Sequence, residues 1–366
     1  MIDRQTDRQT DRQTDRQTDR QTDRQTDRQT DRQTDRNNTL DLLRGLAILI
    51  VVIGHAIQVN LSEGRSCFIW SHLILAFQMP LMFFISGYAT GFSFPSSNPT
   101  QFIWKKVVRL LIPYLSWEII HYFIVAVQPN EYRQLGVVEF LKEVFISDFW
   151  FLRMLFLFFI IMWIADIVLH LIHQEKNTRA SIIVLLVLSL SVILISGVPL
   201  LSQSGSLWYY LWFVFGYIGF HVLKTDFIQK LWKNKLFRRF VFGVGIIAMV
   251  AVVLIMTRKP IQPKLVAVIF CLSICVIVCG IERYIPVFIR QFCVNIGKNT
   301  LPIYAIHWCL LFSPLFRIQL YVKLFSKCPL FISSMLTAAV WMVVCVLLIK
   351  LLRKTKLTRV LLLGDK

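Results

Sequence analysis

The stretch LDLLRGLAILIVVIGH at residues 40–55 decides the fold class, because it is apolar except for Asp41, Arg44 and His55. Together with the residues up to 60, it is long enough for a membrane-spanning helix, which needs about 20 mainly apolar residues. Similar runs recur along the chain, in which 56% of the 366 residues are hydrophobic and only 17% are charged. This composition indicates a membrane protein with several spans and not a soluble globular protein.

Ten apolar segments follow one another, and they predict an all-α fold, a polytopic transmembrane helical bundle of about ten spans. The predicted spans are 40–60, 70–90, 107–127, 149–169, 181–200, 207–223, 240–257, 265–281, 300–320 and 331–350. An even number of spans places both termini on the same side of the membrane.

Lysine and arginine residues are unevenly shared between the two sets of loops that these spans create. One set, with the C-terminal tail, carries Lys105, Lys106, Lys176, Arg179, Lys224, Lys230, Lys233, Lys235, Arg238, Arg239, Arg283, Arg290, Lys350, Arg353, Lys354, Lys356 and Arg359. The other set carries only Arg65, Arg133, Lys142, Arg258, Lys259, Lys323 and Lys327. The richer set is expected to face the cytoplasm, so both termini are predicted to be cytoplasmic. The net charge of +19 is thereby explained without a nucleic-acid partner.

The N-terminal segment has a different character, because Asp-Arg-Gln-Thr is repeated eight times from Asp3 to Thr34. It has no apolar residue to bury and no signal-peptide core, so we expect disorder. Its codons can be written as a repeated GACA unit, and the gain or loss of one unit shifts the reading frame. We interpret the repeat as a phase-variation switch; a peptide repeat with a binding role is the alternative. The predicted domains are the tail 1–36, a transmembrane domain 37–352 and a basic cytoplasmic tail 353–366.

Arg44 and His55 form the main constellation in the first span. They are eleven residues apart, which at about 100° per residue places them on one helix face, about 16 Å apart along the axis. Ionisable residues inside a span are functional-site candidates, because burying them is costly. The alternatives are that Arg44 is an interfacial anchor, paired with Asp41, and that His55 is a hydrogen-bonded histidine of the bundle.

Taken together, these residues resemble the signature of the membrane acyltransferase-3 family: Leu-Asp, then an Arg, ten residues and a His. Other segments resemble the family in the same order, namely FFISGY at 83–88, KVVR at 106–109 with Pro113 and Tyr114, WFL at 150–152, and IGKNTL at 296–301 with Tyr304 and His307. The resemblance covers about residues 37–352. One departure is Lys106, where the family often has an arginine, and lysine lacks the bidentate geometry for phosphate.

The resemblance implies an enzyme of the bacterial inner membrane, an O-acyltransferase that takes an acyl group, with acetyl favoured, from acyl-CoA. The acyl-CoA, such as acetyl-CoA, is a donor substrate, and no permanently bound cofactor is expected. The expected acceptor is a hydroxyl of a surface glycan such as lipopolysaccharide, or of a lipid-linked saccharide. Membrane lipid is the other expected partner, and nucleic acid is not one. The phase-variable repeat favours an exposed glycan, since on–off switching is typical of surface structures.

The donor's phosphates are assigned to Lys105, Lys106 and Arg109, with Arg44 beside them, because these cations can form charge-assisted hydrogen bonds. His55 is predicted to be the general base, since burial favours the neutral imidazole that a base requires. A nucleophilic relay through His55 is the alternative. His307 is a further catalytic candidate, with a packing histidine as the alternative.

Several other groups are given structural interpretations, and no metal site is predicted. Cys271, Cys275 and Cys279 share one helix face and are interpreted as packing residues. His170 and His173, near Glu175, are interpreted as part of a solvated turn. Ser86-Gly87 is expected to bring two helices close together.

Two other classes of function stay open at this point. A secondary transporter or flippase of a small solute or lipid-linked sugar would also suit ten spans and a buried Arg–His pair. Against it, the two halves of the chain show no clear internal repeat. A scaffolding membrane protein is the third interpretation, and it leaves the buried histidine unexplained.

Overall fold

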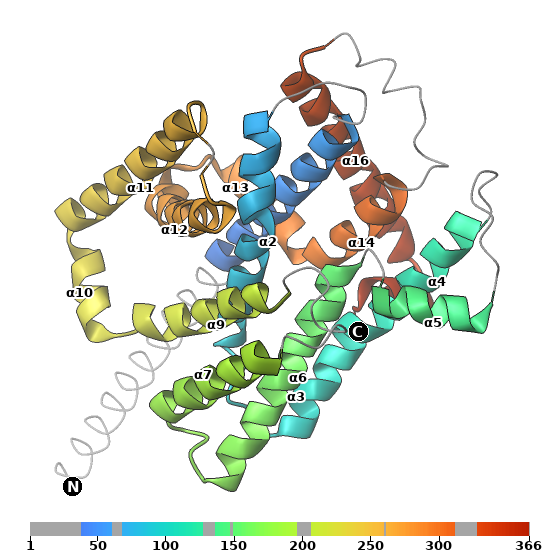
Figure 1. Ribbon diagram of the computed structural model, residues 1–366, viewed down its shortest axis with the longest axis horizontal. Helices are drawn as coiled ribbons and strands as arrows, with labels where there is room; N and C mark the ends of the chain where they lie inside the picture. Colours follow the sequence, from blue (N-terminus) through green and yellow to red (C-terminus); the bar gives the residue numbers. More distant parts are fainter. Residues whose placement is uncertain are drawn as a thin grey trace, which may run out of the picture.

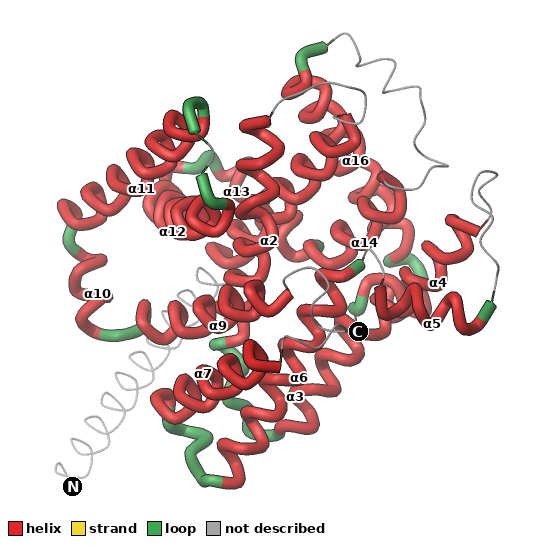
Figure 2. The backbone as a smooth tube through the Cα atoms, viewed as in Figure 1, coloured by secondary structure: helices red, strands yellow, loops and turns green. Residues whose placement is uncertain are grey.

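The computed structural model describes residues 38–60, 68–126, 136–146, 149–195, 206–259, 261–311 and 328–365. These ranges contain helices and short connections and no strand, as Figure 2 shows. The all-helical prediction is therefore confirmed for this part of the chain. The disorder predicted for Asp3–Thr34 falls outside these residues.

The elements follow one another as drawn in Figure 1. They are a first helix Asn38–Asn60, α2 (Phe68–Thr90), α3 (Pro99–Lys106), η1 (Val107–Leu111), α4 (Ile112–Ala126), α5 (Val137–Ile146), α6 (Trp150–Leu171), α7 (Thr178–Ile195), α9 (Ser206–Leu223), α10 (Asp226–Lys233), α11 (Lys235–Met256), α12 (Pro263–Ile281), η2 (Glu282–Tyr284), α13 (Val287–Lys298), α14 (Thr300–Leu311), α16 (Leu330–Leu352), α17 (Lys356–Thr358) and η3 (Arg359–Leu363).

Seven helices in the described ranges are long and apolar enough to cross a membrane. They are Asn38–Asn60, His72–Thr90, Pro99–Ile124, Trp150–Leu171, Lys235–Met256, Pro263–Ile281 and Leu330–Leu352. An eighth results if α9 and α10, which are bent by 74° relative to each other, form one span. The chain is thus a multi-pass membrane protein, whereas the count of ten stays a prediction.

Charged segments that were assigned to loops are largely helical. Lys105 and Lys106 lie in α3, which starts at Pro99 after the N-cap Asn98, so the predicted span 107–127 began too late. Much of the basic stretch 224–239 forms α10 and the start of α11, and α5 lies between residues 131 and 148. The reason is that basic side chains can extend from a helix end toward water while the backbone stays helical.

Glycines allow two pairs of helices to approach backbone to backbone. A Cβ atom at Gly87 of α2 would collide with the carbonyl oxygen of Phe213 in α9, which confirms the close packing expected at this position. A Cβ atom at Gly45 of the first helix would likewise collide with the backbone carbonyl of Cys293 in α13. A Cβ atom at Gly297 of α13 would collide with the backbone carbonyl of Asp41 in the first helix. The first helix is thus held against α13 beside Arg44, as small residues permit in membranes.

The third span is interrupted by η1, a π-helical segment that carries Arg109. Such segments contain one extra residue per turn and often occur at functional sites. The C-terminal segment packs beside it: Trp117 of α4 donates its indole N–H to the carbonyl of Leu362 at 2.9 Å. Gly364, with a φ of 67°, lies close to the backbone of Arg109. The end of the chain therefore supports the helix that presents the predicted donor cations.

Candidate active site

Two histidines from distant parts of the sequence meet in the interior. The ring centroids of His55, on the first helix, and His307, on α14, are 5.4 Å apart. The indole of Trp308 meets His55 edge-on at 4.8 Å, and the ring of Tyr304 lies 5.6 Å from that of His307. The structure therefore brings two of the three predicted catalytic residues together.

The hydrogen bonds of the two imidazoles define their tautomers. Nδ1 of His307 lies 2.8 Å from the carbonyl oxygen of Ile303, which can only accept, so Nδ1 carries the proton. Nδ1 of His55 lies 2.8 Å from Oε1 of Gln58 and donates to it in the same way. Each ring then has its lone pair on Nε2. His307 is fully buried, and within the described residues its Nε2 has no hydrogen-bond partner.

Three buried polar residues that sequence analysis did not single out lie on α2 and α4. Gln78 of α2 lies against Gly54, next to His55, and its buried Oε1 has no hydrogen-bond partner in the described part of the chain. Glu118 and His121 of α4 are buried as well, and Glu118 lies within electrostatic range of Cys309 on α14. Their polar side chains in the middle of predicted spans were the sequence signal that could have identified them as candidates.

The predicted donor cations also come together, around the start of the third span. Lys106 lies within electrostatic range of Arg109, Arg44 and Lys105. Arg44 has a 36% exposed side chain and donates to Asp41 at 3.0 Å, so the pairing considered for it does form. Nζ of Lys106 lies 4.0 Å from the ring centroid of Phe159 and 5.2 Å from that of Phe102. These cation–π contacts fix its position without neutralising its charge.

A cavity of about 450 Å³ opens beside these cations. Its lining consists of Phe92, Ser93, Phe94, Pro95, Ser96, Ser97, Asn98, Gln101, Phe102, Lys105, Lys106 and Arg109. It thus joins three cations to aromatic rings, hydroxyls and amides of the α2–α3 connection. Such a lining suits an anionic ligand that also has a flat ring, because cations bind phosphates and aromatic faces stack on bases.

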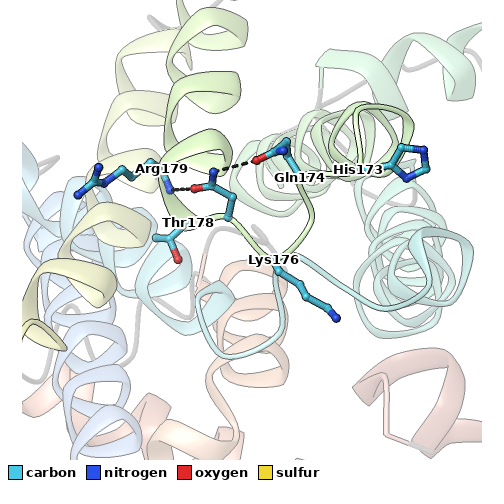
Figure 3. A pocket seen from close by; sticks show the side chains of 6 residues that line it. His173, Gln174, Lys176, Thr178 and Arg179 are labelled. Carbon is cyan, nitrogen blue, oxygen red and sulfur yellow. Dashed lines mark hydrogen bonds between the residues drawn. The ribbon is translucent and has the colours of Figure 1, made fainter.

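A second hollow, at the α6–α7 turn, has a different nature. It is lined by His173, Gln174, Lys176, Asn177, Thr178 and Arg179, and His173 and Lys176 point in different directions in Figure 3. The side chain of Asn177 forms two hydrogen bonds within the turn. Its Nδ2 donates to Oε1 of Gln174 at 2.8 Å, and its Oδ1 accepts from the backbone N–H of Arg179 at 3.0 Å. The bond to Arg179 caps α7, as Asn commonly does, so both bonds of this side chain stay within the turn.

Comparison with known proteins gives two findings. A family described as an acyltransferase domain matches residues 37–353. Two relatives named nodulation protein NolL, from Mesorhizobium japonicum and Sinorhizobium fredii, are each 33% identical to this chain over 82 residues. The match covers 22% of this chain and only 22% of each relative's length. No solved structure matches the chain.

Proposed function

Because the chain belongs to the acyltransferase-3 family, we propose that it transfers an acyl group from acyl-CoA to a hydroxyl of a surface glycan such as lipopolysaccharide. The acyl group in this proposal is acetyl. The observation that carries this proposal is the shared face of the first helix. Arg44 at one end of it adjoins the cations of the third span, and His55 near the other end adjoins His307. A binding site for an anion is thereby joined to a pair of bases, of which His307 is fully buried and His55 is partly buried.

Coenzyme A is long, with an anionic nucleotide at one end and a reactive thioester at the other. We assign its phosphates to Lys105, Lys106 and Arg109, with Arg44 between them and the interior. The uncharged pantetheine arm then follows the first helix for the roughly 16 Å that separate Arg44 from His55. This assignment places the thioester at the histidines while the charges stay near water.

The transfer itself needs a base near the thioester. Nε2 of His55 takes the proton of the acceptor hydroxyl, whose oxygen attacks the thioester carbonyl and forms the new C–O bond. The tetrahedral intermediate then breaks its C–S bond, and the coenzyme A thiolate takes the proton from the His55 imidazolium. We assign to Nε2 of His307 the positioning of the acceptor sugar, because its lone pair can accept a hydrogen bond from a second hydroxyl beside the one that reacts.

The proposed orientation follows the basic residues. With about ten spans and both termini in the cytoplasm, the donor cations lie at the cytoplasmic face of the bacterial inner membrane. A reporter enzyme that is active only in the periplasm should therefore be inactive when fused after Lys233 in α10. Activity of this fusion would contradict the orientation, and the matched fusion near residue 134 should be active.

The proposed reaction is tested by mass spectrometry of surface glycan from cells with and without the gene. We expect the loss of an acetyl mass from the glycan of cells without it. Membranes that contain the protein should restore this mass only when acetyl-CoA is supplied. If the acetyl mass returns to the glycan without any acyl donor, the acyltransferase reaction on this glycan is excluded.

A further inference from the structure

A fully buried carboxylate in α6 is not used by the proposed reaction. Asp166 has 0% exposure, although it lies in a helix that is apolar enough to span the membrane. Its oxygens accept from the Ser96 hydroxyl at 2.6 Å and from the Ser96 backbone N–H at 3.1 Å. A nitrogen of His170 lies 3.8 Å away. A carboxylate at such a position is costly and marks a functional region in membrane proteins.

Ser96 lies in the middle of the connection from α2 to α3, and this connection forms one wall of the cationic cavity. The wall is fixed on both sides of Ser96. Phe94 is buried, with its ring 6.1 Å from Phe102 and 5.5 Å from Tyr217. Asn98 caps α3 by accepting from the N–H of Gln101 at 3.0 Å. Asp166 provides the central attachment, which involves both the side chain and the backbone of Ser96.

One face of α6 positions both walls of the cavity. Phe159 and Asp166 are seven residues apart, so they differ by only about 20° around the helix and lie about 10 Å apart along it. Phe159 supports the ammonium group of Lys106, and Asp166 holds Ser96. Figure 1 shows α6 running beside α3, which carries the cations. The spacing between the cations and the opposite wall therefore depends on this helix.

We propose that Asp166 is a positioning residue, which holds the Ser93–Asn98 wall so that the cavity takes the nucleotide end of the acyl-CoA. This inference rests on the proposed function. The phosphates face Lys105, Lys106 and Arg109, and the half-exposed ring of Phe92 offers a face on which the adenine can stack. Asp166 does not itself line the cavity, because Ser96, whose hydroxyl and backbone N–H bind the carboxylate, forms the wall at this point.

The test compares two donors in the full-length, membrane-embedded protein. Acetyl-CoA carries the nucleotide, and S-acetyl-pantetheine lacks it. For Asp166→Ala we expect KM for acetyl-CoA to rise about 10-fold, which corresponds to the loss of a hydrogen bond to a charged group. The KM for S-acetyl-pantetheine and the kcat for both donors should stay near wild type. Ser96→Ala should show the same pattern with a smaller rise, because the backbone N–H remains.

Thr100→Ala is the matched control, because Thr100 is exposed on α3 and does not line the cavity. It should leave both KM values unchanged. An equal rise in KM for both donors in Asp166→Ala would overturn the proposal, since it would show that Asp166 has a general structural role. If Asp166→Ala fails to accumulate, Ser96→Ala decides by the same comparison.

Direct binding separates this inference from the proposed function. Adenosine 3′,5′-bisphosphate should bind the purified wild-type protein in detergent and bind Asp166→Ala about 10-fold more weakly. This result can hold even if no glycan is acetylated, in which case only the proposed reaction fails. No binding to the wild type, or equal binding to both proteins, would overturn the role of Asp166.

Discussion

At Arg44 the first helix faces a partly exposed group of cations, whereas at His55, about 16 Å further along, it faces imidazole and indole rings in the interior. The cationic region is built from the α2–α3 connection, the end of α3 and a π-helical turn, with the C-terminal residues packed beside it. The histidine region is built from two helices and is closed by aromatic side chains. The difference is that a hydrated anion can bind near water, while proton transfer benefits from a dry and fixed environment.

The largest expected effect comes from the histidine region. His55→Ala should lower kcat by about 10²–10⁴-fold, the usual contribution of a general acid–base group. Protein abundance should stay normal. The measurement is acetyl transfer in membranes at saturating acetyl-CoA, with the protein level checked by blot. Wild-type activity in this variant would remove His55 from the mechanism.

Substitutions in the cationic region should change KM for acetyl-CoA and leave kcat unchanged. Lys106→Ala combined with Arg109→Ala removes two charge-assisted contacts and should raise KM for acetyl-CoA by about 100-fold. Arg44→Ala should give a rise of about 10-fold. The control is Lys264→Ala, because Lys264 lies on α12, outside the cavity lining. A fall in kcat equal to that of His55→Ala would show that the two regions are not separate.

A smaller effect is expected from the second histidine. His307→Gln retains an amide oxygen that can accept a hydrogen bond from a second hydroxyl of the acceptor sugar, and it should lower kcat/KM for the acceptor by about 10-fold. The KM for acetyl-CoA should not change. Kinetics with varied acceptor at fixed donor measure this effect. A loss as large as that of His55→Ala would give His307 a direct role in proton transfer.

The smallest effect is that of ionic strength. Raising the salt from about 0.05 to about 0.5 M should increase KM for acetyl-CoA by about threefold, because exposed charges are screened over about 10 Å at 0.1 M. The KM for S-acetyl-pantetheine should be insensitive. Equal sensitivity of both donors would indicate that salt acts on the protein as a whole and not on the cationic region.

The sequence predicts some parts of this arrangement because they are local. Apolar runs identify the spans, and helical periodicity places Arg44 and His55 on one face. The proximity of His307 to His55 depends on tertiary packing, so only the family resemblance indicated it. Asp166, Glu118 and Gln78 were missed because they are single polar residues in strongly apolar helices, where average hydropathy hides them. The start of the third span was placed too late because Lys105 and Lys106 were assigned to a loop.

The π-helical turn at Val107–Leu111 also determines how far α4 is rotated about the helix axis relative to α3. It accommodates one residue more than an α-helical path would, and each α-helical residue turns the chain by about 100°. α3 and α4 are therefore rotated relative to each other by roughly that angle. An uninterrupted α-helix through the same residues would keep every cation in the sequence and yet turn α4 by this angle about the helix axis relative to Lys105 and Lys106. In this part of the molecule, the helical path of the chain matters as much as its chemistry.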